Sequence, residues 1–343
     1  MTGGSHVLVY SEAFSMHTPP RGSNHLESPY RLSRAIRAIR RSGLLDSKWV
    51  KLRPRLGDLS VFKTVHSPEY LDDLKAEIDS ALDSYFIDSD TYISAGTMAA
   101  LQALAGSIVE AEKLLESTPV KSIIILSRPP SHHAGFSGPG LSAPSLGSCL
   151  VNATAALALN LASRGLNVVV VDFDLGHGNG TQEILRALSG SIPFIDIHQD
   201  YRKTFPWTGG PQDSGENTLN INLPENAGDD IFLTIVAGLE SLLEELSPDV
   251  VVASAGFGLY DSDSHLTLTR LTEASFYRLG EVLSKYRTVA VMELGFSSGI
   301  ENGLPAFMAG LSGISYRTSK ATSSSSSVWS EFEELNRDSI DFV

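Results

Sequence analysis

The sequence contains a single cysteine, Cys149, among its 343 residues. One thiol excludes an intramolecular disulfide, so nothing in the cysteine content points to a secreted, disulfide-stabilised fold. Long apolar runs are also missing, and none approaches the roughly 18 residues that a membrane-spanning helix needs. The first residues, MTGGSHVLVY, have neither the basic segment nor the apolar core of a secretory signal peptide. These features predict a cytoplasmic protein without a membrane span.

Basic residues are scarce relative to acidic ones, with 26 Lys and Arg against 40 Asp and Glu and a formal net charge of −14. A field of that sign repels phosphate backbones, so we do not expect nucleic acid as a partner. The segment RLSRAIRAIRR is the exception, because Arg31, Arg34, Arg37 and Arg40 recur every three residues along one helix face. We interpret this stripe as a solvated face.

Short runs rich in β-branched residues alternate with amphipathic helical patterns. Runs such as VVVV and SIIIL show no polar alternation, which is typical of strands in a parallel sheet that helices cover on both faces. We therefore predict an α/β fold: a single wound domain over residues 1–313, with a mainly parallel central sheet flanked by helices. The predicted strands are residues 6–10, 122–126, 168–171, 194–197, 250–253 and 288–292. The predicted helices are TMAALQALAGSIVEAEKLL, NATAALALNLAS and DDIFLTIVAGLESLLEEL.

Polar residues gather at the carboxyl ends of these runs. SRPPSHHAG follows one predicted strand, DFDLGH the next, SAGFGLYD another and MELGF the last. In wound α/β folds, ligands bind beyond the carboxyl ends of the parallel strands. Four such loops meeting at one crevice therefore predict a site.

The composition changes after Gly313. Residues 314–328 are rich in serine and predict a flexible linker, and residues 329–343 form an acidic C-terminal tail with Trp329, Phe332 and Phe342. The tail is either disordered or a peptide that docks on a protein partner through its aromatic side chains. Because the body and the tail are both acidic, we expect docking on a partner rather than on the chain's own body.

Eight segments occur in an order that is known from one family. They are HTPPRGSNHLESPYR, VHSPEYL, RPPSHHAG, GSCLVN, DFDLGHGNGTQ, FPWTG, SAGFG and MELGF. From about His6 to about Gly313, the chain resembles the histone deacetylase family of the arginase/deacetylase superfamily. The resemblance implies the arginase/deacetylase fold and descent from metal-dependent deacetylases.

The resemblance also implies a catalytic zinc held by Asp, His and Asp, with a further position for water and substrate. Asp174 retains the first ligand, but Gly176 and Gly258 stand at the other two positions. Glycine has no side-chain donor, so we predict a degenerate zinc site and expect no cofactor. Asp261 or Asp263, a few residues beyond Gly258, could rebuild a metal site if their loop folded back.

The catalytic groups that the resemblance implies are only partly present. His132 and His133 match the tandem histidines that act as general base and electrostatic partner. Phe296 replaces the tyrosine that donates a hydrogen bond to the oxyanion, and the loss of one such donor typically costs about 10²–10³ in rate. The two histidines either still catalyse or persist through hydrogen bonds of the ancestral site.

Further positions belong to the implied acetyl-lysine pocket. Ser148 replaces one aromatic wall, Phe205 keeps the opposite wall, and Trp207 replaces a glycine and could narrow or plug the mouth. Asp172 either caps a strand end or lines a structural potassium site of the family type. His177 matches a supporting histidine of the motif rather than a zinc ligand.

Two functions remain open. The first is a histone-deacetylase-like pseudoenzyme that acts by binding, as a scaffold, a regulatory subunit or a reader of acylated lysine or another small amide. The second is an active metal-dependent deacetylase, an amidohydrolase with a rearranged zinc site. Gly176, Gly258 and Phe296 are separate losses at one site, and they favour the first function. We also expect a protein partner.

Overall fold

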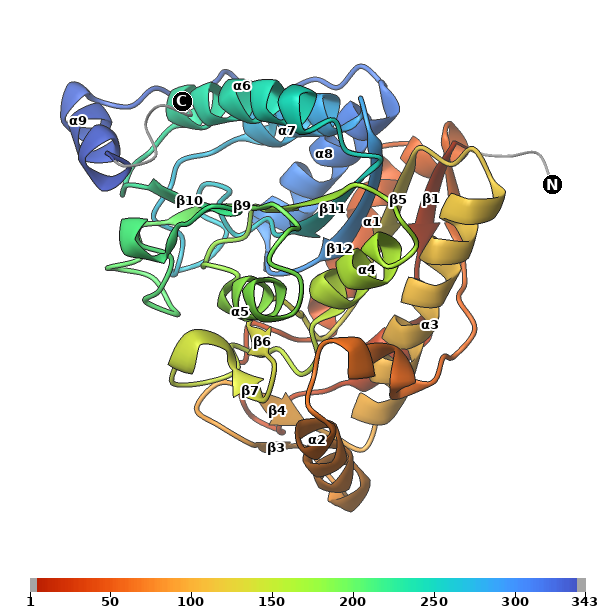
Figure 1. Cartoon of the computed structure of the whole chain (residues 1–343). Coiled ribbons are helices and arrows are strands. Elements are labelled where there is room, and N and C mark those ends of the chain that lie inside the picture. Colours follow the sequence, from red (N-terminus) through yellow and green to blue (C-terminus); the bar gives the residue numbers. More distant parts are fainter. Residues whose placement is uncertain (1–4, 338–343) are drawn as a thin grey trace.

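The structure is a computed structural model that describes residues 5–337. Across these residues, the core is a sheet of eight parallel strands in the order β10-β9-β8-β11-β12-β5-β1-β2 (Figure 1). The strands are β1 (His6–Val9), β2 (Trp49–Leu52), β5 (Ser122–Ile125), β8 (Val168–Asp172), β9 (Phe194–Gln199), β10 (Thr218–Leu223), β11 (Val250–Ala255) and β12 (Arg287–Met292). Two short antiparallel pairs lie outside the sheet: β3 (Tyr85–Phe86) with β4 (Tyr92–Ile93), and β6 (Ala134–Gly135) with β7 (Gly138–Pro139).

Helices cover both faces of the sheet (Figure 1). On one face α7 packs against α6 and α8, and α1 packs against α8, while α3, α4 and α5 lie on the other face. The α-helices are α1 (Tyr30–Arg41), α2 (Pro68–Ser80), α3 (Thr97–Ser117), α4 (Ala153–Ala162), α5 (Asn179–Leu188), α6 (Asp229–Leu246), α7 (Glu273–Leu283), α8 (Leu304–Ser312) and α9 (Ser326–Leu335). Short helical turns are η1 (Glu12–Met16), η2 (Leu44–Asp46), η3 (Leu59–Thr64), η4 (Gly140–Ser142), η5 (Pro211–Asp213) and η6 (Gly299–Gly303).

The parallel sheet between helical layers confirms the predicted α/β fold, and all six predicted strands belong to it. Every residue of β5, β8 and β11 is buried, as expected for uniformly apolar strands covered on both faces. The prediction missed β2 and β10, which are the two edge strands of the sheet. Half of β2 is exposed, and β10 (TLNINL) places asparagines between apolar residues. Neither strand has the continuous apolar run used to find the others.

The interpretation of the arginine stripe as a solvated face is wrong at its first member. Arg31 is 1% exposed. It donates from Nη1 to Glu27 Oε1 (3.2 Å), from Nε to Gly295 O (2.7 Å) and also to Glu293 O. Its charge is thus compensated inside the protein, where it fixes the loop that follows β12. Arg37 and Arg40 are exposed, as predicted.

The serine-rich segment that the sequence predicts to be a flexible linker makes hydrogen bonds to the body of the protein. The backbone N–H of Thr322 donates to Asp229 Oδ2 (2.8 Å), and that of Ser324 donates to Asp230 Oδ2 (2.9 Å). Both aspartates lie in the first turn of α6, and Asp229 is fully buried. The segment therefore supplies donors that a buried carboxylate requires. Its predicted flexibility stays a prediction.

The tail likewise docks on the chain's own body. α9 begins at Ser326, inside the predicted linker, and packs against β10 at the sheet edge (Figure 1). Phe332 is 1% exposed, and Trp329 packs against it with the ring centroids 6.0 Å apart. Phe342 lies outside the described residues.

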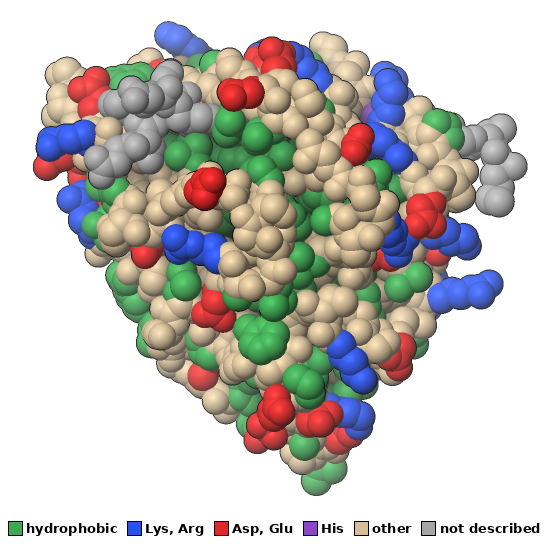
Figure 2. Space-filling model, in the orientation of Figure 1, with side chains coloured by type: hydrophobic (Ala, Val, Ile, Leu, Met, Phe, Trp, Pro, Cys, Tyr) green, Lys and Arg blue, Asp and Glu red, His purple; other side chains and the backbone are tan. Residues whose placement is uncertain are grey.

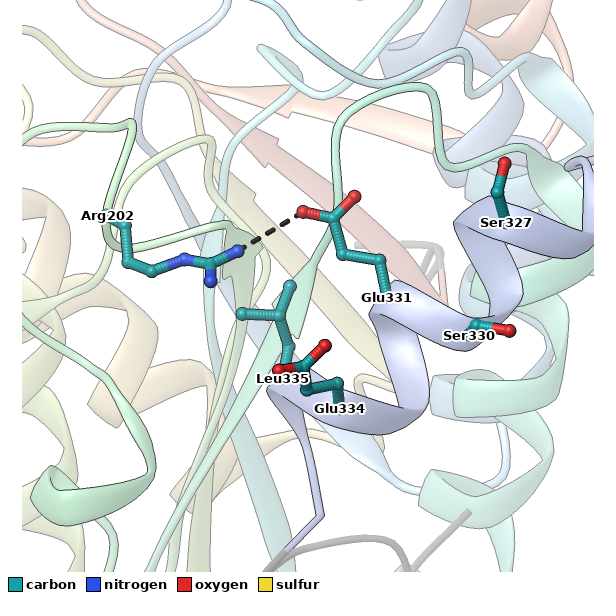
Figure 3. A pocket seen from close by; sticks show the side chains of 6 residues that line it. All are labelled: Arg202, Ser327, Ser330, Glu331, Glu334 and Leu335. Atoms are coloured by element: carbon teal, nitrogen blue, oxygen red, sulfur yellow. Dashed lines mark hydrogen bonds and ion pairs between the residues drawn. The ribbon is translucent and has the colours of Figure 1, made fainter.

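The expectation that acidic tail and acidic body would repel each other is wrong at this contact. Glu331 of α9 faces two basic side chains. Arg202 Nη2 lies 3.2 Å from its carboxylate (Figure 3), and Lys203 Nζ lies 4.0 Å from it. Net charge did not reveal this local complementarity. Over the molecular face in Figure 2, acidic and basic side chains are interspersed. Within residues 5–337, no helix has the length and apolar character to cross a membrane.

Candidate functional site

The predicted site loops leave four neighbouring strands of the sheet. β8, β11, β12 and β5 are adjacent in that order and parallel, so their carboxyl ends open on one edge. DFDLGH begins at the last residue of β8. GFGLYD follows β11, ELGF follows β12, and SRPPSHHAG follows β5 after one further residue. The structure therefore brings the predicted site residues together.

His132 lies between two buried aspartates. Its Nδ1 is 3.0 Å from Asp172 Oδ2, and its Nε2 is 3.0 Å from Asp174 Oδ2. The second contact is not aligned as a hydrogen bond and is an ion pair by distance. Burial alone would lower the pKa of His132, but the attraction of Asp172 and Asp174 outweighs burial and raises that pKa well above its ordinary value. The two carboxylates therefore favour the imidazolium form of His132, and an imidazolium cannot accept a proton as a general base.

His133 has the opposite state. Asn179 Nδ2 donates to Gly140 O (2.6 Å), which turns Asn179 Oδ1 toward His133 Nδ1 at 2.7 Å. Because Oδ1 only accepts, Nδ1 of His133 carries the proton. Burial and the neighbouring charge of His132 lower the pKa of His133 well below its ordinary value. The ring is therefore neutral, and its Nε2 is a hydrogen-bond acceptor.

The residues at the implied zinc site do not fit a zinc ion. Asp174 is fully buried and its carboxylate oxygens have no hydrogen-bond partner, but Gly176 and Gly258 contribute no donors where zinc needs about four. The backbone has also closed around these glycines. A Cβ added at Gly176 would lie 2.4 Å from the carbonyl oxygen of Phe205, and one added at Gly258 would lie 3.0 Å from Cβ of Leu175. Leu175 thus occupies the space beside Gly258.

The two aspartates that could have rebuilt a metal site are directed elsewhere. The Asp263 carboxylate accepts three backbone N–H groups of residues 296–299 at 2.7 to 2.8 Å, so it anchors that loop. Asp261 is exposed and accepts the Ser262 hydroxyl at 3.0 Å. Among residues 5–337, neither joins Asp174 in a group of three potential ligands.

Asp172 and His177 are both held by hydrogen bonds. Asp172 Oδ1 accepts the backbone N–H of Asp174 at 3.1 Å, which is the capping role that the sequence allowed. His177 uses both ring nitrogens, with Nδ1 2.8 Å from Thr208 Oγ1 and Nε2 2.8 Å from Gln182 Oε1. Both residues support the loop. A structural potassium ion beside Asp172 stays a prediction.

A cavity of about 620 Å³ lies beside these loops. Its lining is mainly apolar and includes Leu175, Phe205 and Phe296, with His133 among the polar groups. Phe296 packs near Arg31, whose guanidinium carbon is 5.8 Å from the ring centroid, and has no hydroxyl to donate. A cavity of this size and polarity is suited to a small molecule or an extended side chain.

Trp207 and Ser148 shape the wall of the cavity. Trp207 has φ of 61°, an uncommon conformation for a bulky residue, and its side chain is 55% exposed. Its ring meets that of Phe205 with the centroids 5.6 Å apart, so it extends the wall and does not plug the cavity. Ser148 also lines the cavity, and its hydroxyl donates to Asp90 O at 3.1 Å.

Sequence reasoning missed two residues that determine the character of the site. Leu175 fills the space beside Gly258, and Asn179 fixes the His133 ring. Both lie inside DFDLGHGNGTQ, so the motif itself was the available signal. The missed wall residues Leu266 and Leu268 lie later in the loop after β11, beyond the SAGFG motif.

Comparisons with known proteins agree with the motif order. Residues 25–302 match the model of the histone deacetylase domain. A protein named "Probable deacetylase" from Methanothermobacter thermautotrophicus is 30% identical over 328 residues, covering 92% of this chain and 93% of that protein. One with the same name from Archaeoglobus fulgidus is 29% identical over 312 residues, covering 87% and 82%. The crystal structure of the HDA15 HD domain superposes with a TM-score of 0.83 at 24% identity, covering 99% of this chain and 95% of that chain.

Proposed function

The chain belongs to the histone deacetylase family, and we propose that within this family it acts by binding rather than by hydrolysis. The observation that carries the proposal is the state of the implied metal site. Gly176 and Gly258 stand where two zinc ligands are implied, and Leu175 fills the space beside Gly258. Gly176, Gly258 and Phe296 thus supply neither the metal ligands nor the hydroxyl that the resemblance implies for polarising an amide carbonyl.

The histidines support the same proposal. A general base must be unprotonated and within reach of the attacking water. The carboxylates of Asp172 and Asp174, each 3.0 Å from the ring, favour the protonated form of His132, and all three residues are fully buried. His133 is neutral and lines the cavity, but activating water without a metal or an oxyanion donor gives little rate.

The cavity is suited to an acylated lysine side chain or another small amide. Apolar walls from Leu175, Phe205 and Phe296 take the methylene and acyl groups, because burying apolar surface is favourable. His133 Nε2 accepts a hydrogen bond from an amide N–H. The amide N–H of the ligand thus anchors the ligand to His133, and no metal ligand set or tyrosine hydroxyl of the implied kind activates its carbonyl group.

Binding without turnover is the test. A peptide with one Nε-acetyl-lysine is titrated calorimetrically into the full chain, and the peptide is then analysed by mass spectrometry after prolonged incubation. We expect saturable binding that weakens in Phe205→Ala, with the peptide recovered intact. Deacetylation that scales with protein concentration would contradict the proposal, as would the absence of binding at millimolar peptide.

A metal-dependent deacetylase is the second candidate. The names of the two archaeal relatives favour it, and so do the buried Asp174 carboxylate without a hydrogen-bond partner and the retained histidine pair. This candidate requires a ligand set other than the implied one. It predicts turnover that a chelator removes, that added zinc restores and that Asp174→Asn abolishes.

A protein partner also remains part of the proposal. Phe332 is buried under α9 and cannot contact a partner while α9 is docked. Trp329 is half-buried, and its Nε1 donates to Asp230 Oδ2 at 3.2 Å. A partner that uses both aromatic side chains must therefore displace α9 from β10.

A further inference from the structure

We infer that α9 positions the wall of the cavity, with Asn336 and Glu331 as the positioning residues. The wall in question is the cavity-wall loop, residues 200–209, which follows β9 and carries Phe205 and Trp207. The contacts from α9 limit the mobility of this loop whether the cavity binds or hydrolyses its ligand.

Asn336 pairs with the open edge of the sheet. β10 is an edge strand, so one side of its backbone has no neighbouring strand. Asn336 Oδ1 accepts the backbone N–H of Asn222 at 2.7 Å, and Asn336 Nδ2 donates to the backbone oxygen of Asn222 at 2.9 Å. The side-chain amide thus substitutes for the peptide of a further strand. Asn336 is 1% exposed and Asn222 is fully buried, so both bonds are shielded from water.

The side chain of Asn222 joins the two ends of the cavity-wall loop. Its Oδ1 accepts the backbone N–H of Tyr201 at 3.1 Å, and its Nδ2 donates to the backbone oxygen of Gly209 at 3.0 Å. Asn222 therefore holds the base of the loop with its side chain while Asn336 holds the backbone of Asn222. A shift of Asn222 moves both ends of the loop together.

Glu331 contacts the same loop from the next turn of α9. Figure 3 shows Glu331 and Arg202 pointing toward each other across a groove, and Arg202 also pairs with Asp200 at 2.7 Å. Lys203 lies between Glu331 (4.0 Å) and Glu225 (3.1 Å), and it lines the cavity. These pairs are partly exposed, so their contribution is smaller than that of the buried amide.

Other bonds keep the loop folded if α9 is perturbed. The backbone N–H groups of Lys203 and Thr204 both donate to Asp200 O, and Gly209 N donates to Asp213 Oδ2 at 2.8 Å. Loss of the contacts from α9 should therefore increase the mobility of the loop without unfolding the sheet. Loop mobility and the stability of the whole fold can therefore be measured separately.

Hydrogen–deuterium exchange of the full chain tests the inference. Asn336→Ala should make the amides of residues 200–209 exchange roughly tenfold faster, because two buried hydrogen bonds to Asn222 are lost. Asn336→Asp has nearly the same shape but cannot donate to the Asn222 oxygen, so it should give the same effect. Glu331→Gln should give a smaller increase than Asn336→Ala.

Glu334→Gln is the matched control, since Glu334 lies one turn from Glu331 on α9 and, within residues 5–337, forms no ion pair. It should leave the exchange of residues 200–209 at the wild-type rate. The inference is overturned if Asn336→Ala leaves that rate unchanged, or if β5 and β12 accelerate as much as the loop. Equal effects of Glu331→Gln and Glu334→Gln would remove Glu331 as a positioning residue.

Discussion

Replacement of Asp174 by asparagine separates two roles for this buried carboxylate. If Asp174 is an uncompensated ligand in a metal-free protein, its ionised form is costly to bury, and Asp174→Asn stabilises the fold. If His132 neutralises it, Asp174→Asn leaves the imidazolium with one fewer counter-charge and destabilises the fold. The sign of the change is therefore the informative quantity.

The structure sets the expected magnitude. His132 Nε2 lies 3.0 Å from Asp174 Oδ2, and both residues are fully buried. Removing one partner of a buried ion pair typically costs about 3–5 kcal/mol. His132 keeps its contact with Asp172, so we expect a loss near the lower end, about 3 kcal/mol.

Urea denaturation after exhaustive dialysis against a chelator measures this loss. Asp174→Asn should lower the midpoint while the dependence on urea concentration stays the same. Asp261→Asn is the matched control, because Asp261 is exposed and should have almost no effect. A more stable Asp174→Asn protein would refute the assignment of His132 as an imidazolium counter-ion.

Four further substitutions probe the packing and the charges. Phe332→Ala removes a buried ring from α9 and should lower the free energy of unfolding by up to about 3 kcal/mol, or by less if α9 detaches before the body unfolds. An unchanged thermal midpoint would show that α9 does not stabilise the body of the protein. Gly176→Ala should lower the free energy of unfolding by about 1–3 kcal/mol, because the new Cβ would lie 2.4 Å from a backbone oxygen. Gly258→Ala should lower it by less, because its Cβ would meet only the Leu175 side chain. Equal losses of stability in urea denaturation would contradict this difference. Burial raises the pKa of Glu293 to about 7, so its neutral form contributes stability that is full below pH 4.5 and is lost as the pH rises through 7. Glu293→Gln has no carboxyl group to ionise, so its free energy of unfolding relative to wild type should increase between pH 5 and 8. A difference in stability that does not change with pH would show that the pKa of Glu293 is not raised.

The central fold was predictable because its strands are covered on both faces. A strand that is buried on both faces has almost no polar residues, and the apolar runs VVVV and SIII show this pattern in the sequence. β10 could not be found this way, because asparagines interrupt its apolar residues, and one of its edge contacts comes from Asn336, 114 residues after Asn222. Such a pairing has no local pattern.

The positions of the site were predictable from motif order, but their charge states were not. The charge state that His132 favours depends on two carboxylates at the end of β8, each 3.0 Å from its ring, whereas His132 itself lies in the loop after β5. Arg31 was misassigned for the same reason, since its partners lie on distant segments. The docking of α9 was missed because net charge says nothing about the local ion pairs of Glu331 with Arg202 and Lys203.

The metal content of the purified full chain tests the central claim most directly. After expression with zinc in the medium and dialysis without a chelator, elemental analysis gives the zinc bound per chain. Because Gly176 and Gly258 supply no ligands, the account predicts far less than one zinc per chain and no change in thermal midpoint on adding zinc. A stoichiometric zinc ion that survives dialysis and is lost in Asp174→Asn would contradict it.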